Sequence, residues 1–338
     1  MTDAMIHGGD LAAARARFGE PAANGIPGGW LDLSTGINPQ PYPFLAPEPA
    51  AWQRLPQQTE VDALIDAAAQ RYGVADRACI VAAPGSQAIL QWLPRLILPT
   101  QVTVLGPTYG EYAPTWRAAE HGVTTVRELS GATNATVVVL ANPNNPDGHR
   151  YPPEVLLQLA EGLHARGGWL VVDEAFADAD PQISLARYAG TPGLILLRSL
   201  GKFYGLAGLR LGFALAPAGF AARLAAAMGP WAVGGPALAI GAQALNDAAW
   251  AAETRARLAL ASERLAGLLR QNGLTAIGGT ALFQLARHPE AARLYEHLGR
   301  RGILVRAFDG QPDWLRFGLP AARDAGRLDA ALAAFSTH

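Results

Sequence analysis

The sequence predicts an α/β protein in which a mostly parallel sheet forms a large domain and a smaller α+β domain follows it. Short apolar strands alternate with helical segments between residues 61 and 216, which is typical of a parallel sheet covered by helices. Near residue 236 this order gives way to a long helical stretch and then to a tail of strands. The chain has 338 residues, of which 50% are hydrophobic, so it is long enough for two domains with large cores.

The elements of the large domain alternate in a regular order. An amphipathic helix is predicted over 61–73 (VDALIDAAAQRYG), where Gly73 ends it, and the strand CIVAA follows at 79–83. The next predicted segments are helix 86–93, strand 102–105, helix 109–122, strand 137–141, helix 152–168, and strands 169–176, 194–199 and 211–216.

The two ends of the chain follow other patterns. The first sixty residues are rich in Pro and Gly and are predicted to be loop-like. Residues 236–273 form the long helical stretch, and strands are predicted near 281–287, 302–306 and 314–318. We therefore expect an N-terminal arm over 1–48 that packs with the small domain, a large domain over 49–235 and a small domain over 236–338.

Composition argues against several kinds of partner. Lys and Arg number 27 against 28 Asp and Glu, and no basic run exceeds a pair, so neither nucleic acid nor an anionic membrane surface is expected. The chain also has no 18-residue apolar run and no apolar signal segment at its start, so no membrane association is expected. Cys79 is the single cysteine and permits no internal disulfide, which favours a cytoplasmic protein.

Polar residues follow the predicted strands, at the edge of an open α/β sheet where ligands bind. They are Gly85, Ser86 and Gln87 after the first strand, Tyr109 after the second, Asn145 after the third, Asp173 at the end of WLVVD, and Ser199 and Lys202 after LILLR. Lys202 is the only lysine of the chain, and Arg210 follows it by eight residues in the apolar, glycine-rich segment SLGKFYGLAGLRLGFA. Two isolated cations in such a segment indicate a bound anion or a lysine used for its chemistry.

Each of these residues has a simpler interpretation when taken alone. Gly and Ser before a helix are usually a cap, although the same backbone N–H groups also bind phosphate. An acid such as Asp173 at a strand end is commonly a capping residue, but a buried carboxylate requires a cation. Together, the lysine, the acid, the phosphate-binding segment, the aromatic ring and the asparagine match pyridoxal 5'-phosphate (PLP). Lysine forms a Schiff base with this cofactor, and the acid keeps its pyridine nitrogen protonated.

Three motifs then resemble the class I/II aminotransferase family of fold type I: NPNNPDG (142–148), VVDEAF (171–176) and SLGKFYGLAGLRLGF (199–213). The resemblance implies that Lys202 forms the Schiff base and that Asp173 pairs with the pyridine nitrogen. Asn145 would contact the phenolic oxygen of the cofactor, and Tyr109 would stack on its ring. The remaining implied contacts are Gly85, Ser86, Gln87, Ser199 and Arg210 to the cofactor phosphate, and Arg316 in WLRFG to the substrate carboxylate. The family also implies a homodimer, and we expect no metal.

Other features point to a narrower group within this family. Phe176 and Leu55 stand where many transaminases have tyrosines near the cofactor, and the segments HGGD (7–10) and LDLSTGINPQPYP (31–43) resemble the threonine-phosphate decarboxylases of cobalamin biosynthesis. The implied reaction converts L-threonine O-3-phosphate to (R)-1-amino-2-propanol O-2-phosphate and CO2. A decarboxylase differs from a transaminase in holding Cα–COO⁻, and not Cα–H, perpendicular to the cofactor ring. The residues expected to bind this phosphorylated amino acid are His7, Gly36, Asn145, Arg306 and Arg316.

Two alternatives stay open on the sequence. The first is an aminotransferase that acts on a phosphorylated amino compound such as histidinol phosphate, because all the predicted cofactor residues serve both reactions. The second is a binding or regulatory module without catalysis, which the presence of Lys202 disfavours.

Overall fold

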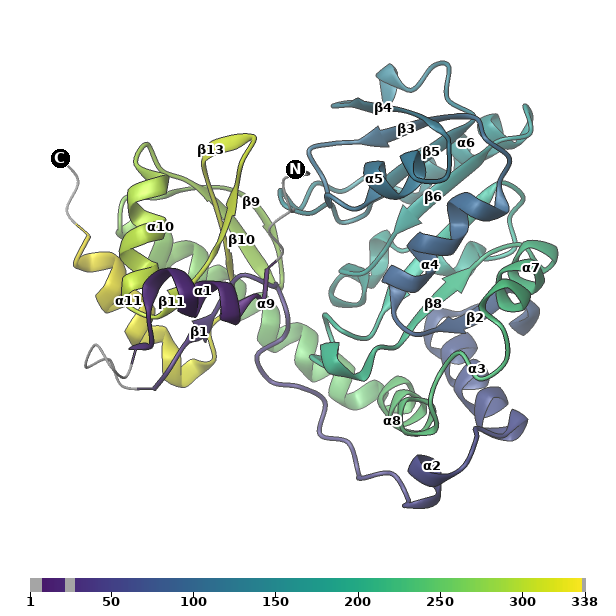
Figure 1. Ribbon diagram of the computed structural model, residues 1–338, viewed down its shortest axis with the longest axis horizontal. Coiled ribbons are helices and arrows are strands. Elements are labelled where there is room, and N and C mark those ends of the chain that lie inside the picture. The colour runs from purple at the N-terminus through teal and green to yellow at the C-terminus, as the bar shows by residue number, and fades with distance from the viewer. Residues whose placement is uncertain (1–7, 22–27, 336–338) are drawn as a thin grey trace. The chain divides into compact units, whose positions relative to one another are not determined.

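The structure is a computed structural model that describes residues 8–21 and 28–335 (Figure 1). The chain divides into two compact units, which we call unit 1 (residues 1–40, 146–148 and 255–338) and unit 2 (residues 41–145 and 149–254). The units change over at 40/41 and 254/255, whereas the sequence placed the domain limits at 48/49 and 235/236. Those domain limits stay a prediction.

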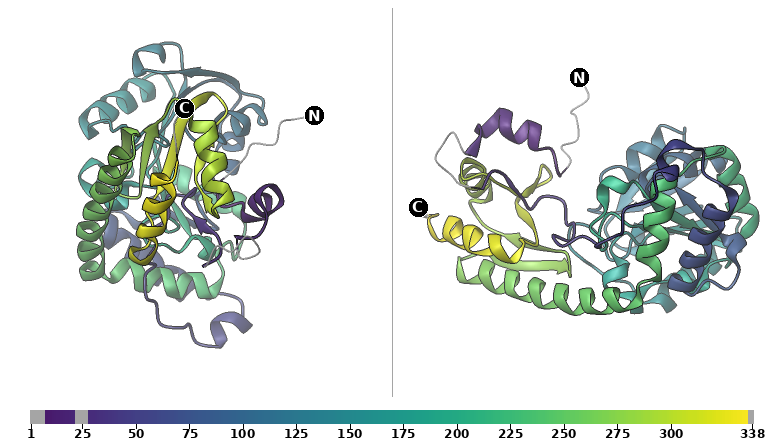
Figure 2. Two further views of the ribbon diagram at one scale, coloured as in Figure 1. Left: turned by 90° about the vertical axis from the view of Figure 1, so that its left-hand side faces the viewer. Right: turned by 90° about the horizontal axis from the view of Figure 1, so that it is seen from below.

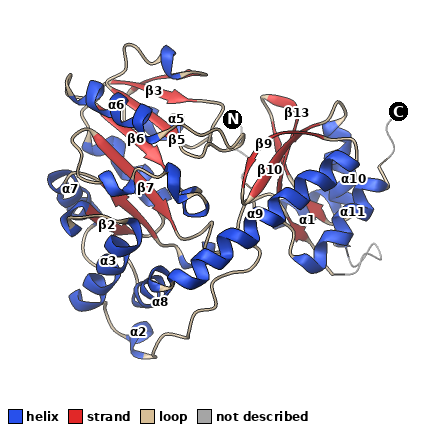
Figure 3. Ribbon diagram, turned by 180° about the vertical axis from the view of Figure 1, so that it is seen from behind, coloured by secondary structure: helices blue, strands red, loops and turns tan. Residues whose placement is uncertain are grey.

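Unit 2 contains a seven-stranded sheet in the order β2-β8-β7-β6-β5-β3-β4 (Figures 1 and 3). β8 is antiparallel to both of its neighbours, and the other pairs are parallel, which confirms the predicted mostly parallel sheet. The strands are β2 (Ile80–Ala83), β3 (Gln101–Leu105), β4 (Gly122–Val126), β5 (Val137–Ala141), β6 (Trp169–Asp173), β7 (Leu194–Ser199) and β8 (Gly212–Leu215).

Helices cover this sheet. The helices of unit 2 are α2 (Ala50–Gln53), α3 (Gln58–Tyr72), α4 (Ser86–Trp92), α5 (Tyr112–Arg117), α6 (Pro153–His164), α7 (Ala218–Met228) and α8 (Gly235–Asn246). Side chains of α4, α5 and α7 share one apolar core with alternate strand residues such as Val139, Val171 and Leu197. The intervening strand residues, among them Leu140 and Leu196, are also fully buried, so both faces of the central strands are covered.

Local signals in the sequence explain where the helices begin and end. α3 starts with a capping box between Gln57 and Glu60 and ends at Gly73, whose φ of 68° lies in the left-handed region. The predicted long helical stretch is two helices, α8 and α9 (Ala248–Gln271), which are separated at Asp247. The Asp247 carboxylate accepts a hydrogen bond of 2.9 Å from the N–H of Trp250, so it caps the start of α9 and breaks the continuous helix.

Unit 1 is built around a four-stranded antiparallel sheet in the order β12-β13-β10-β9. Figure 1 labels β9, β10 and β13, and Figure 2 shows the same ribbon from two further sides. Its strands are β9 (Thr275–Thr280), β10 (Phe283–Arg287), β12 (Arg306–Phe308) and β13 (Gln311–Gly318), and its helices are α1 (Leu11–Phe18), α10 (Ala291–Arg300) and α11 (Ala325–Ala333), while α9 begins in unit 2. α10 packs against β13. The segment β1 (Leu31–Asp32) adds a parallel pairing with β11 (Ile303–Leu304).

Several elements differ from the sequence prediction. α1 lies in the segment predicted to be loop-like, because Asp10 accepts a hydrogen bond of 2.8 Å from Ala13 N–H and so starts a helix between the Gly- and Pro-rich stretches. β4 and β9 were not predicted, since β4 is largely exposed and β9 contains two adjacent glycines. No helix among the described residues is both long and apolar enough to cross a membrane.

Candidate functional site

The carboxyl edge of the unit 2 sheet carries the residues predicted to hold a cofactor. Asp173 is the last residue of β6 and Ser199 is the last residue of β7. Gly85 precedes α4 directly after β2, and Tyr109 and Asn145 lie in the loops after β3 and β5. Because these strands run parallel, all five residues lie at the same edge. Lys202 and Arg210 lie in the segment that connects β7 to β8, which begins and ends at this edge.

Asp173 is buried and held by two donors. Its Oδ2 accepts a hydrogen bond of 2.7 Å from the Tyr112 hydroxyl, and its Oδ1 accepts one of 2.9 Å from Ala175 N–H. Burial raises the pKa of the Asp173 carboxyl, and the two hydrogen bonds and the charges of Lys202 and Arg198 oppose that rise. The carboxylate is therefore suited to face a cationic ring nitrogen.

The start of α4 lies close to Arg210. Gly85 has a φ of 84°, and a Cβ placed on it would lie 2.8 Å from an Nη atom of Arg210. Arg210 itself adopts the left-handed conformation with a φ of 53°. A Cβ on Gly212 would lie 2.5 Å from the backbone N of Ser86, so glycine at 212 allows β8 to approach the start of α4. This close packing places a guanidinium beside the first N–H groups of the helix, which is an arrangement that binds phosphate.

Lys202 lies beside an aromatic ring. Its Nζ is 5.7 Å from the centroid of the Phe176 ring, and Phe176 is buried. The ring offers no hydroxyl at the position where many transaminases have a tyrosine. Leu55, the other departure, is 59% exposed.

Tyr109 and Gln87 are joined directly. The Tyr109 hydroxyl donates to Gln87 Oε1 at 3.1 Å, which fixes the ring near the first turn of α4. The rings of Tyr109 and Tyr112 form a T-shaped pair, with a centroid separation of 5.5 Å and an interplanar angle of 80°. Sequence reasoning missed Tyr112. The signal that could have found it is its spacing of three residues from Tyr109, because in the helix predicted over 109–122 this spacing would place both rings on one side.

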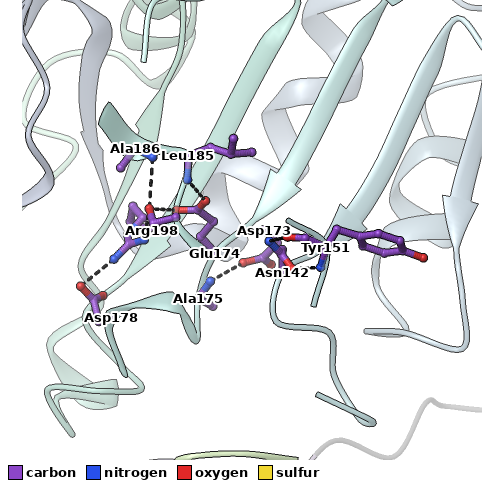
Figure 4. A network of polar contacts seen from close by, with 10 residues as sticks. Asn142, Tyr151, Asp173, Glu174, Ala175, Asp178, Leu185, Ala186 and Arg198 are labelled. Atoms are coloured by element: carbon purple, nitrogen blue, oxygen red, sulfur yellow. Dashed lines mark hydrogen bonds and ion pairs between the residues drawn. The ribbon is translucent and has the colours of Figure 1, made fainter. Parts of the chain in front are cut away.

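Asn145 lies in a loop that its neighbours fix. Asn144 accepts a hydrogen bond of 2.7 Å from Thr108 Oγ1 and donates one of 2.9 Å to Pro107 O. Asn142 exchanges two hydrogen bonds with the backbone of Tyr151 (Figure 4). The first two asparagines of NPNNPDG thus hold the loop that carries Asn145.

A second polar cluster lies at the carboxyl ends of β6 and β7 (Figure 4). This cluster was not predicted from the sequence. Arg198 donates to Glu174 at 2.7 Å and to Asp178 at 2.6 Å, and all three side chains are at least 97% buried. Side chains alternate along a strand, so Glu174 and Arg198 project to the opposite face from Asp173 and Ser199. The cluster therefore ties the ends of β6 and β7 together beneath the cofactor residues. Arg198 was hidden in the sequence because it stands in the apolar run LILLRS.

Arg306 and Arg316, two of the five predicted substrate residues, lie in unit 1, whereas Asn145 belongs to unit 2. Arg306 and Arg316 are direct partners across β12 and β13, so their side chains project to the same face. Arg316 is buried and donates to the backbone oxygen of Ser34. Burial lowers the pKa of Arg316 to about 9, with a further contribution from the charge of Arg306, while Asp32 opposes the change. Two cations on one face, one of them buried, favour an anionic ligand.

The other two substrate residues can be placed only in part. Gly36 has a φ of 64° and lies near the end of β13, where Gly318 N–H donates to Leu33 O at 2.6 Å. His7 lies outside the described residues, so the structure does not place it.

The model of the family described as aminotransferase class I and II matches residues 48–335 of the chain. The chain belongs to this family. A threonine-phosphate decarboxylase of Pseudomonas aeruginosa is 47% identical over 338 residues, with 98% of each chain covered. A protein of the same name from a Sinorhizobium species is 46% identical over 340 residues, covering 98% of this chain and 99% of the relative.

A solved structure confirms the fold of this aminotransferase family. The histidinol-phosphate aminotransferase of Clostridium acetobutylicum superposes with a TM-score of 0.78 and covers 90% of this chain and 98% of its own. Its sequence is only 21% identical, so this likeness concerns the fold alone.

The residues at the carboxyl edge of unit 2 fit the cofactor that this family implies. A buried carboxylate that two donors orient suits a protonated pyridine nitrogen, and the Gly85–Arg210 packing suits a phosphate. Lys202, in the connection from the same edge, is the only lysine of the sequence that could link to PLP.

Proposed function

We propose that this chain is a PLP-dependent decarboxylase that converts L-threonine O-3-phosphate to (R)-1-amino-2-propanol O-2-phosphate and CO2. One observation carries the proposal: two relatives that bear the name threonine-phosphate decarboxylase are 47% and 46% identical over 98% of the chain. The carboxyl edge of unit 2 supplies side chains suited to the cofactor, and Arg306 and Arg316 of unit 1 supply cations suited to an anionic substrate.

In this proposal the edge of unit 2 holds the cofactor. Lys202 would bind PLP covalently, Asp173 would pair with the ring nitrogen, Tyr109 would stack on the ring and Asn145 would contact the phenolic oxygen. The cofactor phosphate would be held by residues around the start of α4 and the β7–β8 connection, namely Gly85, Ser86, Gln87, Ser199 and Arg210. When bound, PLP supplies an electron sink for the pair released at Cα of the substrate.

Five residues bind and orient the substrate in this proposal. We assign the substrate carboxylate to Arg316, the substrate phosphate to Arg306 and His7, and a supporting contact to Gly36, with Asn145 as a further contact. The Cα–COO⁻ bond breaks, CO2 leaves, and Cα gains a proton. We assign the return of that proton to Lys202 Nζ, an amine that can act as a general acid. Orientation by two separate anionic groups would select the carboxylate bond over Cα–H.

Two alternatives remain as outcomes of the test. An aminotransferase acting on a compound such as histidinol phosphate would use the same cofactor residues, and the absence of a hydroxyl on Phe176 and Leu55 disfavours it. A non-catalytic binding module would not require the lysine, the acid and the phosphate residues at one sheet edge.

The deciding experiment supplies L-threonine phosphate to the PLP-loaded protein without any keto acid. We expect CO2 and an equal amount of aminopropanol phosphate, and no product from the matched Lys202→Ala protein. Rapid transfer of an amino group from histidinol phosphate to a keto acid, without CO2 from threonine phosphate, would replace the decarboxylase with the aminotransferase. Purified protein that takes up no PLP would favour the binding module.

The setting of the reaction is also a proposal. We place the enzyme in the cytoplasm, where its single cysteine needs no partner, and in cobalamin biosynthesis.

We further propose a homodimer. The segment from Leu45 to Leu55 supports it, because Leu45 is 78%, Trp52 is 69% and Leu55 is 59% exposed. Sedimentation of the wild-type protein beside Trp52→Glu would test whether this segment lies in the dimer interface.

A further inference from the structure

Tyr112 makes a direct contact with the acid that the proposed function places at the ring nitrogen. Its hydroxyl lies 2.7 Å from Asp173 Oδ2, and Tyr112 and Asp173 are 1% and 7% exposed. Burial and the adjacent Asp173 raise the pKa of Tyr112 well above its usual value, so the phenol keeps its proton and acts as a donor. The other carboxylate oxygen is fixed by Ala175 N–H at 2.9 Å. Both oxygens of Asp173 are therefore oriented by donors from the chain itself.

Arg198 and Lys202 also carry charges that act on Asp173, but neither is dedicated to this carboxylate as Tyr112 is. Arg198 acts on Asp173 from a distance, and its own charge is already met by Glu174 and Asp178 at 2.7 and 2.6 Å. The charge of Lys202 also acts on Asp173, and this amine is the group that would link to the cofactor. Tyr112 is the side chain that donates a hydrogen bond to Asp173 without changing its own state.

Tyr112 also connects the acid to two other predicted cofactor residues. Its ring meets Tyr109 edge to face at 5.5 Å, and the Tyr109 hydroxyl donates to Gln87 in the first turn of α4. One fully buried side chain at the start of α5 thus supports both the acid and the stacking ring.

We propose that Tyr112 is a positioning residue: it orients the Asp173 carboxylate and keeps it a weak base, so that the ring nitrogen of bound PLP retains the proton. This inference rests on the proposed function. A carboxylate that accepts a strong hydrogen bond binds a proton less tightly, because the hydrogen bond stabilises its charged form. Without the Tyr112 hydroxyl, the proton between Asp173 and the ring nitrogen moves toward the carboxylate. The ring then accepts electrons less well.

The test compares Tyr112→Phe with a matched control, Tyr42→Phe. The control also loses hydroxyl contacts to a backbone oxygen and a carboxylate, those of Gln243 at 3.2 Å and Asp247 at 3.4 Å, but none to Asp173. The readout is the ¹⁵N NMR signal of the ring nitrogen in protein loaded with ¹⁵N-labelled PLP. We expect a protonated signal in the wild type and in Tyr42→Phe, and a shift toward the unprotonated signal in Tyr112→Phe. Turnover of Tyr112→Phe should fall about 10–100-fold, as expected when a hydrogen bond to a charged group is lost.

Tyr112→His provides a second variant, because it restores an N–H donor and should return part of the protonated signal. An unchanged signal in Tyr112→Phe, with a wild type that binds PLP and releases CO2, would overturn the role of Tyr112 and leave the proposed function intact. A wild type that binds no PLP would instead overturn the proposed function.

Discussion

At the scale of single residues, the proposed chemistry depends on a few side chains whose surroundings are unlike those of the surface. Asp173 is buried between two donors, and Lys202 lies beside an aromatic ring without a hydroxyl. Arg316 is a buried cation with a second arginine across the strand pair. These are environments in which one substitution changes chemistry more than it changes the fold.

Lys202→Ala should remove the covalent link to the cofactor while leaving the fold intact. Lys202 is the only lysine in the sequence, so borohydride reduction of the wild type should leave one pyridoxyl adduct that mass spectrometry places on residue 202. The variant should carry no adduct and show no turnover. An adduct on the N-terminal amine alone would contradict the assignment.

Asp173→Asn should leave the ring nitrogen largely unprotonated, because the amide cannot stabilise the added charge. Loss of such an electrostatic partner lowers kcat by about 10²–10³-fold. Steady-state kinetics and the absorption spectrum of the bound cofactor measure the effect. Near-normal turnover with an unchanged spectrum would show that Asp173 only caps its strand.

Arg306→Gln should weaken the reaction of the phosphorylated substrate, because the cation that we assign to the substrate phosphate is lost. Both kcat and affinity should fall, since remote binding energy orients the reacting bond. The cofactor spectrum should not change. The control is Arg300→Gln, which removes an exposed arginine of the same unit. Equal kinetics for the two variants would remove Arg306 from the substrate site.

At the scale of elements, the site depends on where the strands end and on how closely β8 approaches the start of α4. β6 and β7 place Asp173 and Ser199 at one edge, and the buried Glu174–Arg198–Asp178 cluster ties these strand ends from the other face. Removing one partner of such a buried cluster leaves an uncompensated charge and costs about 3–5 kcal/mol. The cluster therefore belongs to the framework that holds the site.

Gly212→Ala tests the approach of β8 to α4. The added Cβ would lie 2.5 Å from Ser86 N and 2.7 Å from Arg198 O, so backbone must move. We expect a loss of about 1–3 kcal/mol in the free energy of unfolding and weaker PLP binding, because the phosphate-binding segment is displaced. In Gly208→Ala, the matched control, the added Cβ meets nothing within 4 Å. Chemical denaturation and PLP titration compare the two variants. Equal free energies of unfolding and equal PLP affinities would show that the close approach of β8 to α4 supports neither stability nor cofactor binding.

At the scale of the whole molecule, the sequence predicted the sheet and the edge that carries the cofactor residues. Asp173, Ser199 and Lys202 could be found because each follows an apolar strand, and parallel strands end together. Tyr112 was missed, since an aromatic residue in a helix usually packs in a core, and its hydrogen-bond partner is 61 residues away. Arg198 looked like part of an apolar strand until its two buried acids were located.

The ends of helices were harder to predict from the sequence than the presence of the helices. Asp247 breaks the long helical stretch through one capping hydrogen bond, and Asp10 starts a helix in a segment rich in Gly and Pro. Such caps depend on a single side chain, whereas apolar periodicity reports only on the interior of an element.

The proposed decarboxylation requires that the Cα–COO⁻ bond breaks while the Cα–H bond is kept. The most direct measurement supplies L-threonine phosphate that carries deuterium at Cα and follows the product by mass spectrometry in ordinary water. A decarboxylase replaces only the carboxylate with a solvent proton, so we expect aminopropanol phosphate that retains the deuterium. Loss of the deuterium to solvent, with amino-group transfer to a keto acid and no CO2, would contradict it.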